Sequence, residues 1–269
     1  MVRASGDRLD QQESGDLRRS KSVIRQKHDL PPDMHKYWRA RHDLFSRFSE
    51  GILLDTESWY SVTPEAVAYR LAAQCACHTI LDAFCGAGGN AIQFAMTCER
   101  VVAIDIDPLK IALARHNAQI YGVQQRITFL CGDIRDFVKD RAQKDVDGDL
   151  WGGCINLNFD VIFLSPPWGG VGYLNPSLPE DVEKQKFLDE YSLSELSPLK
   201  GLDLFRLARQ VSKNVVLYLP RNTNLNEISQ LSQVEPDTTF NIQIEELWLG
   251  YKLKALAVYV SELPDSTQD

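Results

Sequence analysis

Short apolar runs alternate with stretches of helical periodicity from residue 79 to residue 260. This alternation predicts β–α units around a doubly wound, mainly parallel sheet, which is an α/β fold. The last two runs are close enough in the sequence to form an antiparallel hairpin. The predicted strands are 79–84, 100–105, 126–133, 159–165, 214–220, 242–250 and 253–260, and the predicted helices are 90–98, 108–122, 134–140, 202–212 and 224–233.

The segment before residue 79 follows a different pattern. Residues 1–30 are polar and lack periodicity, which predicts a disordered tail. Apolar spacing predicts one helix over 34–48 and a second over 61–75, with Thr63 as N-cap and Pro64 at its first position. The expected organisation is a tail (1–30), an N-terminal helical extension (31–77), an α/β domain (78–262) and a short tail (263–269).

Two segments of the α/β domain have no clear periodicity. Residues 141–158 are polar and contain several glycines, which predicts an inserted loop. Residues 170–201 form a long connection that we expect to contribute to a substrate lid.

Composition sets limits on the class of protein. With 269 residues and 44% apolar residues, the chain can form one sizeable globular domain with extensions. It has no run of about 18 apolar residues, so no membrane span is expected. Its polar start lacks the apolar core of a secretory signal. Its six cysteines show neither a CxxC pair nor a metal-binding Cys/His spacing, which predicts reduced thiols and no metal site.

Charge is distributed unevenly along the chain. The net charge of −8 argues against a protein that coats nucleic acid. Residues 18–47 nevertheless hold nine lysines and arginines against three acids. A basic stretch on an acidic body suits phosphate contact at one place, and the alternative is a solvated basic tail.

A glycine-rich turn follows the first predicted strand of the α/β domain. The sequence from Asp82 to Asn90 reads DAFCGAGGN, and Asp105 ends the next strand 19 residues after Gly86. Glycines let a turn approach a ligand closely, and a carboxylate at that distance can bind ribose hydroxyls. These features fit either a dinucleotide or S-adenosylmethionine.

Two details favour S-adenosylmethionine over a dinucleotide. The turn lacks the GxGxxG spacing that holds a pyrophosphate. Asp82 would repel a diphosphate but suits a donor that carries an ammonium and a sulfonium. Asp133 follows the third strand, where it can bind an adenine amino group. The predicted donor-binding residues in this region are Asp82, Gly86, Asn90, Asp105 and Asp133.

The fourth strand of the α/β domain runs into the sequence FLSPPWGG (163–170). Proline cannot donate to a sheet ladder, so the strand must end there with carbonyl groups free of regular partners. The carbonyl of Ser165 or Pro166 can accept from an exocyclic amine and aim its nitrogen at a methyl group. Trp168 offers a face on which a positively charged base can stack.

These motifs, together with KYWRARHDLFSRFSEGILLD, WYSVTPE, VVAIDIDPLKIALARHNAQIYG and YLPRN, resemble the trimethylguanosine synthase family over about residues 34–260. The resemblance implies a Rossmann-like class I methyltransferase with a seven-stranded sheet. It implies S-adenosylmethionine as cofactor and 7-methylguanosine-capped RNA as partner, with two methyl groups added to guanine N2 on small nuclear and nucleolar RNA caps. It also implies work in the nucleus, with the cytoplasm as a second compartment.

The resemblance further implies roles by position. Ser61 and Thr63 would join the three aspartates around the donor. Ser165 and Pro166 would lie beside the acceptor amine, Trp168 would stack on the base, and Asn117 would face the base edge. The expected phosphate contacts are Lys36, Arg221 and the adjacent Asn222.

Other functions remain open from the sequence. The same Pro-Pro geometry suits an N6-adenine or a glutamine amide methyltransferase. A non-catalytic cap-binding module could keep the fold, although the chain retains every predicted donor-binding acid. An NAD-dependent dehydrogenase is disfavoured because the pyrophosphate turn is missing.

Overall fold

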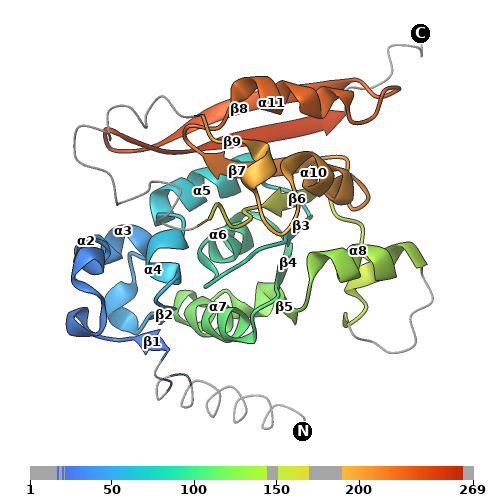
Figure 1. The fold of residues 1–269 in the computed structure, drawn as a ribbon. Coiled ribbons are helices and arrows are strands. Elements are labelled where there is room, and N and C mark those ends of the chain that lie inside the picture. The colour runs from blue at the N-terminus through green and yellow to red at the C-terminus, as the bar shows by residue number, and fades with distance from the viewer. Residues whose placement is uncertain (1–16, 18–19, 21, 144–150, 170–189, 263–269) are drawn as a thin grey trace, which may run out of the picture. The chain divides into compact units, whose positions relative to one another are not determined.

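The computed structural model describes residues 17, 20, 22–143, 151–169 and 190–262. Seven strands of these ranges form one sheet in the order β5-β4-β3-β6-β7-β9-β8 (Figure 1). The pairs β3/β6, β6/β7 and β4/β5 are parallel, and β9 is antiparallel to both β7 and β8. The strands are β3 (Thr79–Asp82), β4 (Arg100–Asp105), β5 (Ile127–Cys131), β6 (Val161–Leu164), β7 (Val215–Pro220), β8 (Phe240–Leu249) and β9 (Lys252–Glu262). The predicted mainly parallel, seven-stranded sheet and its terminal hairpin are confirmed.

Helices connect the strands as the periodicity predicted. α7 is the best specified, because the Asp107 side chain accepts from the Leu109 N–H at 2.8 Å and Gly122 ends it with a left-handed φ of 72°. The helices of the sheet region are α5 (Glu65–Gln74), α6 (Gly89–Thr97), α7 (Pro108–Tyr121), α8 (Ile134–Gln143), α10 (Gly201–Arg209) and α11 (Leu225–Ser229).

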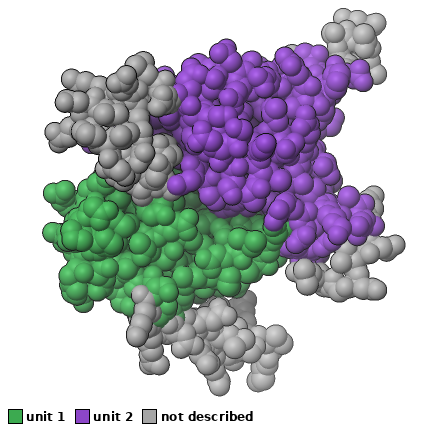
Figure 2. Space-filling view, viewed as in Figure 1, with its two compact units in different colours: residues 1–76, 85–133 green, residues 77–84, 134–269 purple. Residues whose placement is uncertain are grey.

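The chain forms two compact units, which Figure 2 colours separately. Unit 1 comprises residues 1–76 and 85–133, and among its fully buried side chains are Phe94, Ile104 and Leu113. Unit 2 comprises residues 77–84 and 134–269, and among its fully buried side chains are Phe163, Phe205 and Leu217. Each unit therefore has an apolar core of its own.

Part of the predicted N-terminal tail is ordered. β1 (Val23–Ile24) pairs antiparallel with β2 (Leu54–Asp55), and Val23 and Leu30 are buried. The expectation of disorder through residue 30 is therefore wrong for the residues around β1. Two apolar residues are too few to give a periodic signal, and their partner strand lies about thirty residues later in the sequence.

The predicted helix over 34–48 is broken into shorter pieces. α2 (His35–Arg39) and α3 (Arg41–Leu44) are followed by a 3-10 turn, Phe48–Glu50. Aromatic packing accounts for the break, because the rings of Trp38 and Phe48 lie 5.2 and 5.4 Å from the fully buried Trp59. Tertiary contacts outweigh local helix propensity in this segment.

The predicted helix over 61–75 begins later than expected. α4 (Ser58–Ser61) is a separate turn, and α5 starts at Glu65 with Pro64 as its N-cap residue. Thr63 does not cap α5, because its hydroxyl oxygen accepts a hydrogen bond from the Asn90 side chain. Thr63 therefore binds Asn90 at the start of α6 and does not cap α5.

The segment 141–158 contains buried side chains, although its sequence is mainly polar. α8 continues to Gln143, and Trp151 and Cys154 are buried. The Trp151 ring packs edge-on against Phe137 at 5.3 Å, and its indole N–H donates to Asp140 at 2.9 Å. The prediction of a plain polar loop is wrong at these positions, while residues 144–150 and 170–189 lie outside the described residues.

Gly88 provides a test of the packing between α6 and α7. Its φ is +89°, and a Cβ atom there would lie 3.0 Å from Cα of Ala114. Gly122 has a similar φ of +72° but nothing within 4 Å of its Cβ position. We expect Gly88→Ala to lower the free energy of unfolding more than Gly122→Ala does. The Gly122 variant should lose only about 1–2 kcal/mol, which is what alanine costs at a positive φ. Urea denaturation measures both, and equal losses would contradict the close contact.

Candidate active site

Asp105 organises the glycine-rich turn of unit 1. Its carboxylate accepts from the N–H of Gly86 at 2.9 Å and from the N–H of Asp107 at 3.0 Å. The neighbouring Cys85 N–H donates to Ile104 O at 2.9 Å, which ties the turn to β4. Burial raises the pKa of Asp105 above its ordinary value, against the effect of these two N–H groups and of the Lys110 charge. The turn and the carboxylate are therefore held as one rigid piece.

Asn90 lies at the start of α6 with one polar atom unused. Its amide nitrogen donates to the Thr63 hydroxyl at 3.1 Å. Its Oδ1 atom is buried and has no hydrogen-bond partner among the described residues. A buried acceptor without a partner is unfavourable, and a ligand that carries N–H groups would satisfy it. Thr63 is buried beside Asn90, whereas Ser61 at the end of α4 is exposed.

The region after β4 and β5 contains a residue that the sequence analysis missed. Ile106 directly follows Asp105 and is 67% exposed, although it is a large apolar side chain. Asp133, half-buried, stands two residues after the end of β5. The Gly132 N–H donates to the Asp105 carbonyl at 2.9 Å, which brings these two strand ends together. An apolar residue directly after the acid that is predicted to bind ribose is the signal that could have identified Ile106.

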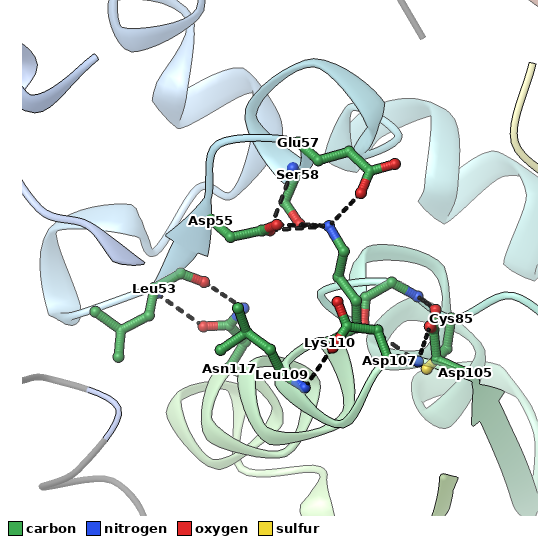
Figure 3. A network of polar contacts seen from close by, with 11 residues as sticks. Leu53, Asp55, Glu57, Ser58, Cys85, Asp105, Asp107, Leu109, Lys110 and Asn117 are labelled. Carbon is green, nitrogen blue, oxygen red and sulfur yellow. Dashed lines mark hydrogen bonds and ion pairs between the residues drawn. The ribbon is translucent and has the colours of Figure 1, made fainter. Parts of the chain in front are cut away.

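A buried ion pair joins the N-terminal extension to α7. Lys110 Nζ lies 2.9 Å from both carboxylate oxygens of Asp55 and 3.1 Å from the Ser58 hydroxyl. Glu57 lies 3.2 Å from the same ammonium. Only 7% of the Lys110 side chain and 13% of the Asp55 side chain are exposed. In Figure 3 the lysine reaches from the first turn of α7 to the segment around β2 and α4.

The pKa values of this pair follow from their mutual contacts. Burial by itself raises the pKa of Asp55, but hydrogen bonds from Ser58 and Lys110 outweigh it and hold that pKa below its ordinary value. Burial likewise opposes the charge of Lys110, and the two acids more than compensate, so its pKa is raised. Both groups are therefore charged at neutral pH.

A second polar cluster fastens the extension near Phe45. The Tyr121 hydroxyl donates to Glu65 at 2.6 Å, and the Ser46 hydroxyl donates to the same carboxylate at 2.8 Å. Burial and the Glu65 contact raise the pKa of Tyr121 to about 12. Phe45 is buried, and its ring lies 4.0 Å from where a Cβ atom on Gly89 would be. The extension thus reaches the glycine-rich turn.

Asn117 does not face a base edge. Its side chain is fully buried, its Oδ1 accepts from the Leu53 N–H at 3.0 Å, and its Nδ2 donates to the carbonyls of Leu53 and Ala87, each at 3.0 Å (Figure 3). These bonds use both amide N–H groups. The predicted base contact is contradicted, because Asn117 instead joins the extension to the glycine-rich turn.

Lys36, by contrast, is available at the surface. The side chain is exposed, and its ammonium lies 5.2 Å from the centre of the Tyr37 ring. Arg41 stands in the same way over Trp38, at 5.5 Å. The basic stretch predicted over 18–47 is therefore partly arranged over aromatic rings, which orients its cations.

In unit 2, the end of β6 has the open backbone that its prolines predict. The Ser165 hydroxyl donates to Phe84 O at 3.2 Å, and Pro166 is buried. Pro167 O accepts from the Ser197 N–H at 3.4 Å. Among the described residues, no group donates a hydrogen bond to the carbonyl oxygens of Ser165 or Pro166. Asp82, at the carboxyl end of β3 in the same unit, is fully buried.

Trp168 packs against Tyr218 on β7. Its indole N–H donates to Tyr218 O at 3.2 Å, and the two rings pack at 5.2 Å with planes 33° apart. The tryptophan is half-buried. One face of the indole is thus supported by β7, which holds the ring in a defined position.

Arg221 and Asn222 directly follow β7. Arg221 is half-buried, and its guanidinium donates to Leu253 O at 3.4 Å. The Asn222 carbonyl accepts from the Tyr191 N–H at 2.8 Å. The structure therefore places both residues at the same end of the parallel strands of unit 2 as Trp168.

Within each unit, most of the predicted residues come together. Unit 1 joins Gly86 to Asp105 and Thr63 to Asn90 by hydrogen bonds. Among the described residues, no three His, Cys, Asp or Glu side chains are grouped to bind a metal ion. Nor does any helix in the described ranges have the length and apolar character that a membrane span requires.

Comparison with known proteins gives a family match. The family model of RNA cap guanine-N2 methyltransferases matches residues 77–263. Over 211 residues the chain is 41% identical to a trimethylguanosine synthase of Schizosaccharomyces pombe, which covers 76% of this chain and 78% of the relative. Over 208 residues it is 36% identical to a trimethylguanosine synthase of Saccharomyces cerevisiae, with 74% of this chain but only 58% of the relative covered.

A solved structure shows the same fold. A provisionally assigned methyltransferase from Porphyromonas gingivalis W83 matches with a TM-score of 0.56 at 13% identity, over 99% of this chain and 62% of that chain. At this identity, the likeness supports the Rossmann-like methyltransferase architecture and nothing more specific.

The Lys110–Asp55 pair gives a stability prediction. Lys110→Met should lower the free energy of unfolding by about 3–5 kcal/mol, because Asp55 would remain buried without its cation. The double variant Lys110→Met/Asp55→Asn should recover part of this loss. The exposed pair Arg206–Asp203 is the control, and Arg206→Met should change the free energy by less than about 1 kcal/mol. Equal losses in the Lys110 and Arg206 variants would contradict a buried pair.

The pH dependence of stability follows from the same two groups. The folded pKa of Asp55 is lowered, so its contribution is present above the ordinary aspartate pKa and is lost as pH falls through the lowered value. The folded pKa of Lys110 is raised, so its contribution is present below the ordinary lysine pKa and is lost as pH rises through the raised value. The difference in stability between wild type and the double variant should therefore be constant around neutral pH and shrink at both extremes.

Proposed function

The chain belongs to the RNA cap guanine-N2 methyltransferase family, and from this membership we propose that it adds two methyl groups to N2 of 7-methylguanosine caps to give 2,2,7-trimethylguanosine. The proposed methyl donor is S-adenosylmethionine and the proposed substrate is capped RNA. The observation that carries the proposal is the end of β6, where two carbonyl groups that accept no hydrogen bond from the described residues precede an oriented tryptophan.

The donor would be held mainly by unit 1. Asp105 would accept from the ribose hydroxyls, and its support by Gly86 and Asp107 fixes it in place for that contact. The unused Oδ1 of Asn90 fits the ammonium of the donor's amino acid part. Ile106 would pack on the adenine ring, and Asp133 would accept from its amino group. We assign Ser61, Thr63 and Asp82 to the same donor on the family resemblance.

The acceptor would be positioned by the end of β6. The carbonyl of Ser165 or Pro166 would accept a hydrogen bond from the guanine amine and direct the nitrogen lone pair. When bound, S-adenosylmethionine supplies a methyl group whose bond to sulfur breaks as the new N–C bond forms. The amine proton would leave to water after transfer.

Trp168 would bind the methylated base. A 7-methylguanine ring carries positive charge, and an indole gives the strongest cation–π attraction of the aromatic side chains. Tyr218 supports the indole on one side and through its carbonyl, so the ring needs little reorganisation to bind. Lys36 and Arg221, with Asn222 beside it, would contact the cap phosphates.

The other methyltransferase readings receive less support. An adenine N6 or glutamine amide enzyme would use the same carbonyl geometry, but the matching family acts on cap guanine. The family resemblance also suggests nuclear work, which localisation of the tagged protein would test.

The substrate prediction is tested with a 7-methylated cap dinucleotide and labelled S-adenosylmethionine. We expect mono- and then dimethylation at guanine N2, identified by mass spectrometry of the digested product. An unmethylated cap should be a poor acceptor, because it lacks the positive charge that favours stacking. Label at another atom, or equal use of the unmethylated cap, would overturn the proposal.

Trp168→Ala tests the stacking role. Stacking contributes about 1–3 kcal/mol per base, so kcat/KM for the cap dinucleotide should fall by about 5-fold to 150-fold. Trp168→Phe should retain part of the activity. Binding of S-adenosylhomocysteine, measured by calorimetry, should stay near wild type in both variants. A parallel loss of that binding would mean that Trp168 serves the fold instead.

A further inference from the structure

We propose that the tip of the β8–β9 hairpin, residues 248–254, binds the RNA chain that follows the cap. This inference rests on the proposed function, because it concerns the same capped substrate. It adds a second binding surface in unit 2 that would distinguish a capped RNA from a cap alone.

The register of the sheet places the tip beyond the ligand-binding edge of unit 2. β6 and β7 are parallel, so Trp168 and Arg221 lie at the same edge, where both strands end. β9 runs antiparallel to β7, and its pairing with β7 stops at Pro220 opposite Ala255. Past that edge, the pairs Trp248/Leu253 and Leu249/Lys252 continue β8 and β9 as a two-stranded ribbon.

The distance along the ribbon suits a substrate that is longer than the cap. Trp168 contacts Tyr218, which pairs with Ala257. Lys252 is five residues from Ala257 along β9, which corresponds to about 17 Å at the rise of a β-strand. A chain that leaves the proposed cap site toward the tip would run along this surface.

The side chains of the tip have the chemistry of a single-stranded RNA surface. Trp248 is 51% exposed and Tyr251 is fully exposed. Exposed single apolar residues are common, but two aromatic rings within four positions are a stacking platform of the kind that binds successive bases. The Trp248 indole N–H donates to Glu246 at 3.1 Å, which holds that ring in place on the surface.

Cations lie on the same ribbon, and Lys252 pairs with Leu249, so it is on the face opposite Trp248. Lys252 is exposed and Lys254 is half-buried, both on β9. The Arg221 guanidinium donates to Leu253 O, so the proposed phosphate-binding arginine is attached to the base of the tip. The chain carries a net charge of −8, and a local group of three cations on it favours a polyanion. Aromatic rings alone would suit a protein partner equally well, and the cations favour RNA.

The test compares two substrates with the double variant Trp248→Ala/Tyr251→Ala. The KM for a short 7-methylguanosine-capped RNA should rise at least about tenfold, since stacking on two rings is lost. Both kcat and KM for the cap dinucleotide should stay within about twofold of wild type, which also reports that the variant is folded. Tyr69→Ala is the matched control, because Tyr69 is 60% exposed on α5, and it should change neither substrate.

A second pair of variants separates stacking from charge. Trp248→Phe/Tyr251→Phe should restore most of the affinity for the capped RNA. Lys252→Ala should reduce the dependence of the RNA KM on salt while leaving the cap dinucleotide unchanged.

Each alternative gives a different result. An unchanged KM for the capped RNA in the alanine variant would overturn the proposal, because the tip would then not bind the RNA chain. An equal rise for both substrates would also overturn it, because the tip would then shape the cap site. If wild type fails to methylate the cap dinucleotide at all, the proposed function fails, and binding of labelled capped RNA by fluorescence polarisation still tests the tip.

Discussion

The interaction on which unit 1 depends is the buried contact between Lys110 and Asp55. An ammonium and a carboxylate removed from water are unfavourable unless they meet in good geometry and their remaining groups are satisfied. Here Ser58 donates its backbone N–H to Asp55, and Glu57 adds a second negative charge near the ammonium. Breaking the contact would leave a buried charge, so the segment around β2 and α4 is fixed on the first turn of α7.

That constraint explains why the N-terminal extension can take part in the donor site. Lys110 lies in the first turn of α7, the helix that follows Asp105, and Ser58 begins the turn that leads to Thr63. The bond between Thr63 and Asn90 and the bonds of Asn117 then join the extension to the glycine-rich turn at Asn90 and at Ala87. The extension therefore belongs to the same compact unit as the acid that would hold the ribose.

The sequence predicted those features that are recorded in local patterns. α7 was predicted closely because a capping aspartate, Pro108 and Gly122 mark both of its ends. The turn after β3 and the end of β6 could be read because glycine and proline have few structural uses. The same reasoning identified Asp105 and Trp168, whose chemistry follows from their places at strand ends.

Features that depend on distant contacts could not be predicted in this way. Lys110 is a charged residue in a helix, and nothing local shows that it is buried by Asp55, 55 positions earlier. The role of Asn117 at a base edge came from the family resemblance, and nothing local shows that its amide is buried and bonded to the backbone of Leu53 and Ala87. The strand pair that joins Val23 to Asp55 is only two residues long, which is too short for alternating apolar and polar positions to be recognised in the sequence.

The antiparallel strands β8 and β9 explain how a mainly parallel sheet can extend past the edge where its parallel strands end. Parallel strands end where their connecting helices begin, so they cannot extend past the ligand-binding edge without a new crossover. A hairpin needs only two residues to turn, and β9 can continue past Pro220 because β8 satisfies its hydrogen bonds. The ribbon past Ala255 thus offers surface beyond the end of β7, and the RNA contact proposed there would leave the ends of β6 and β7 unchanged.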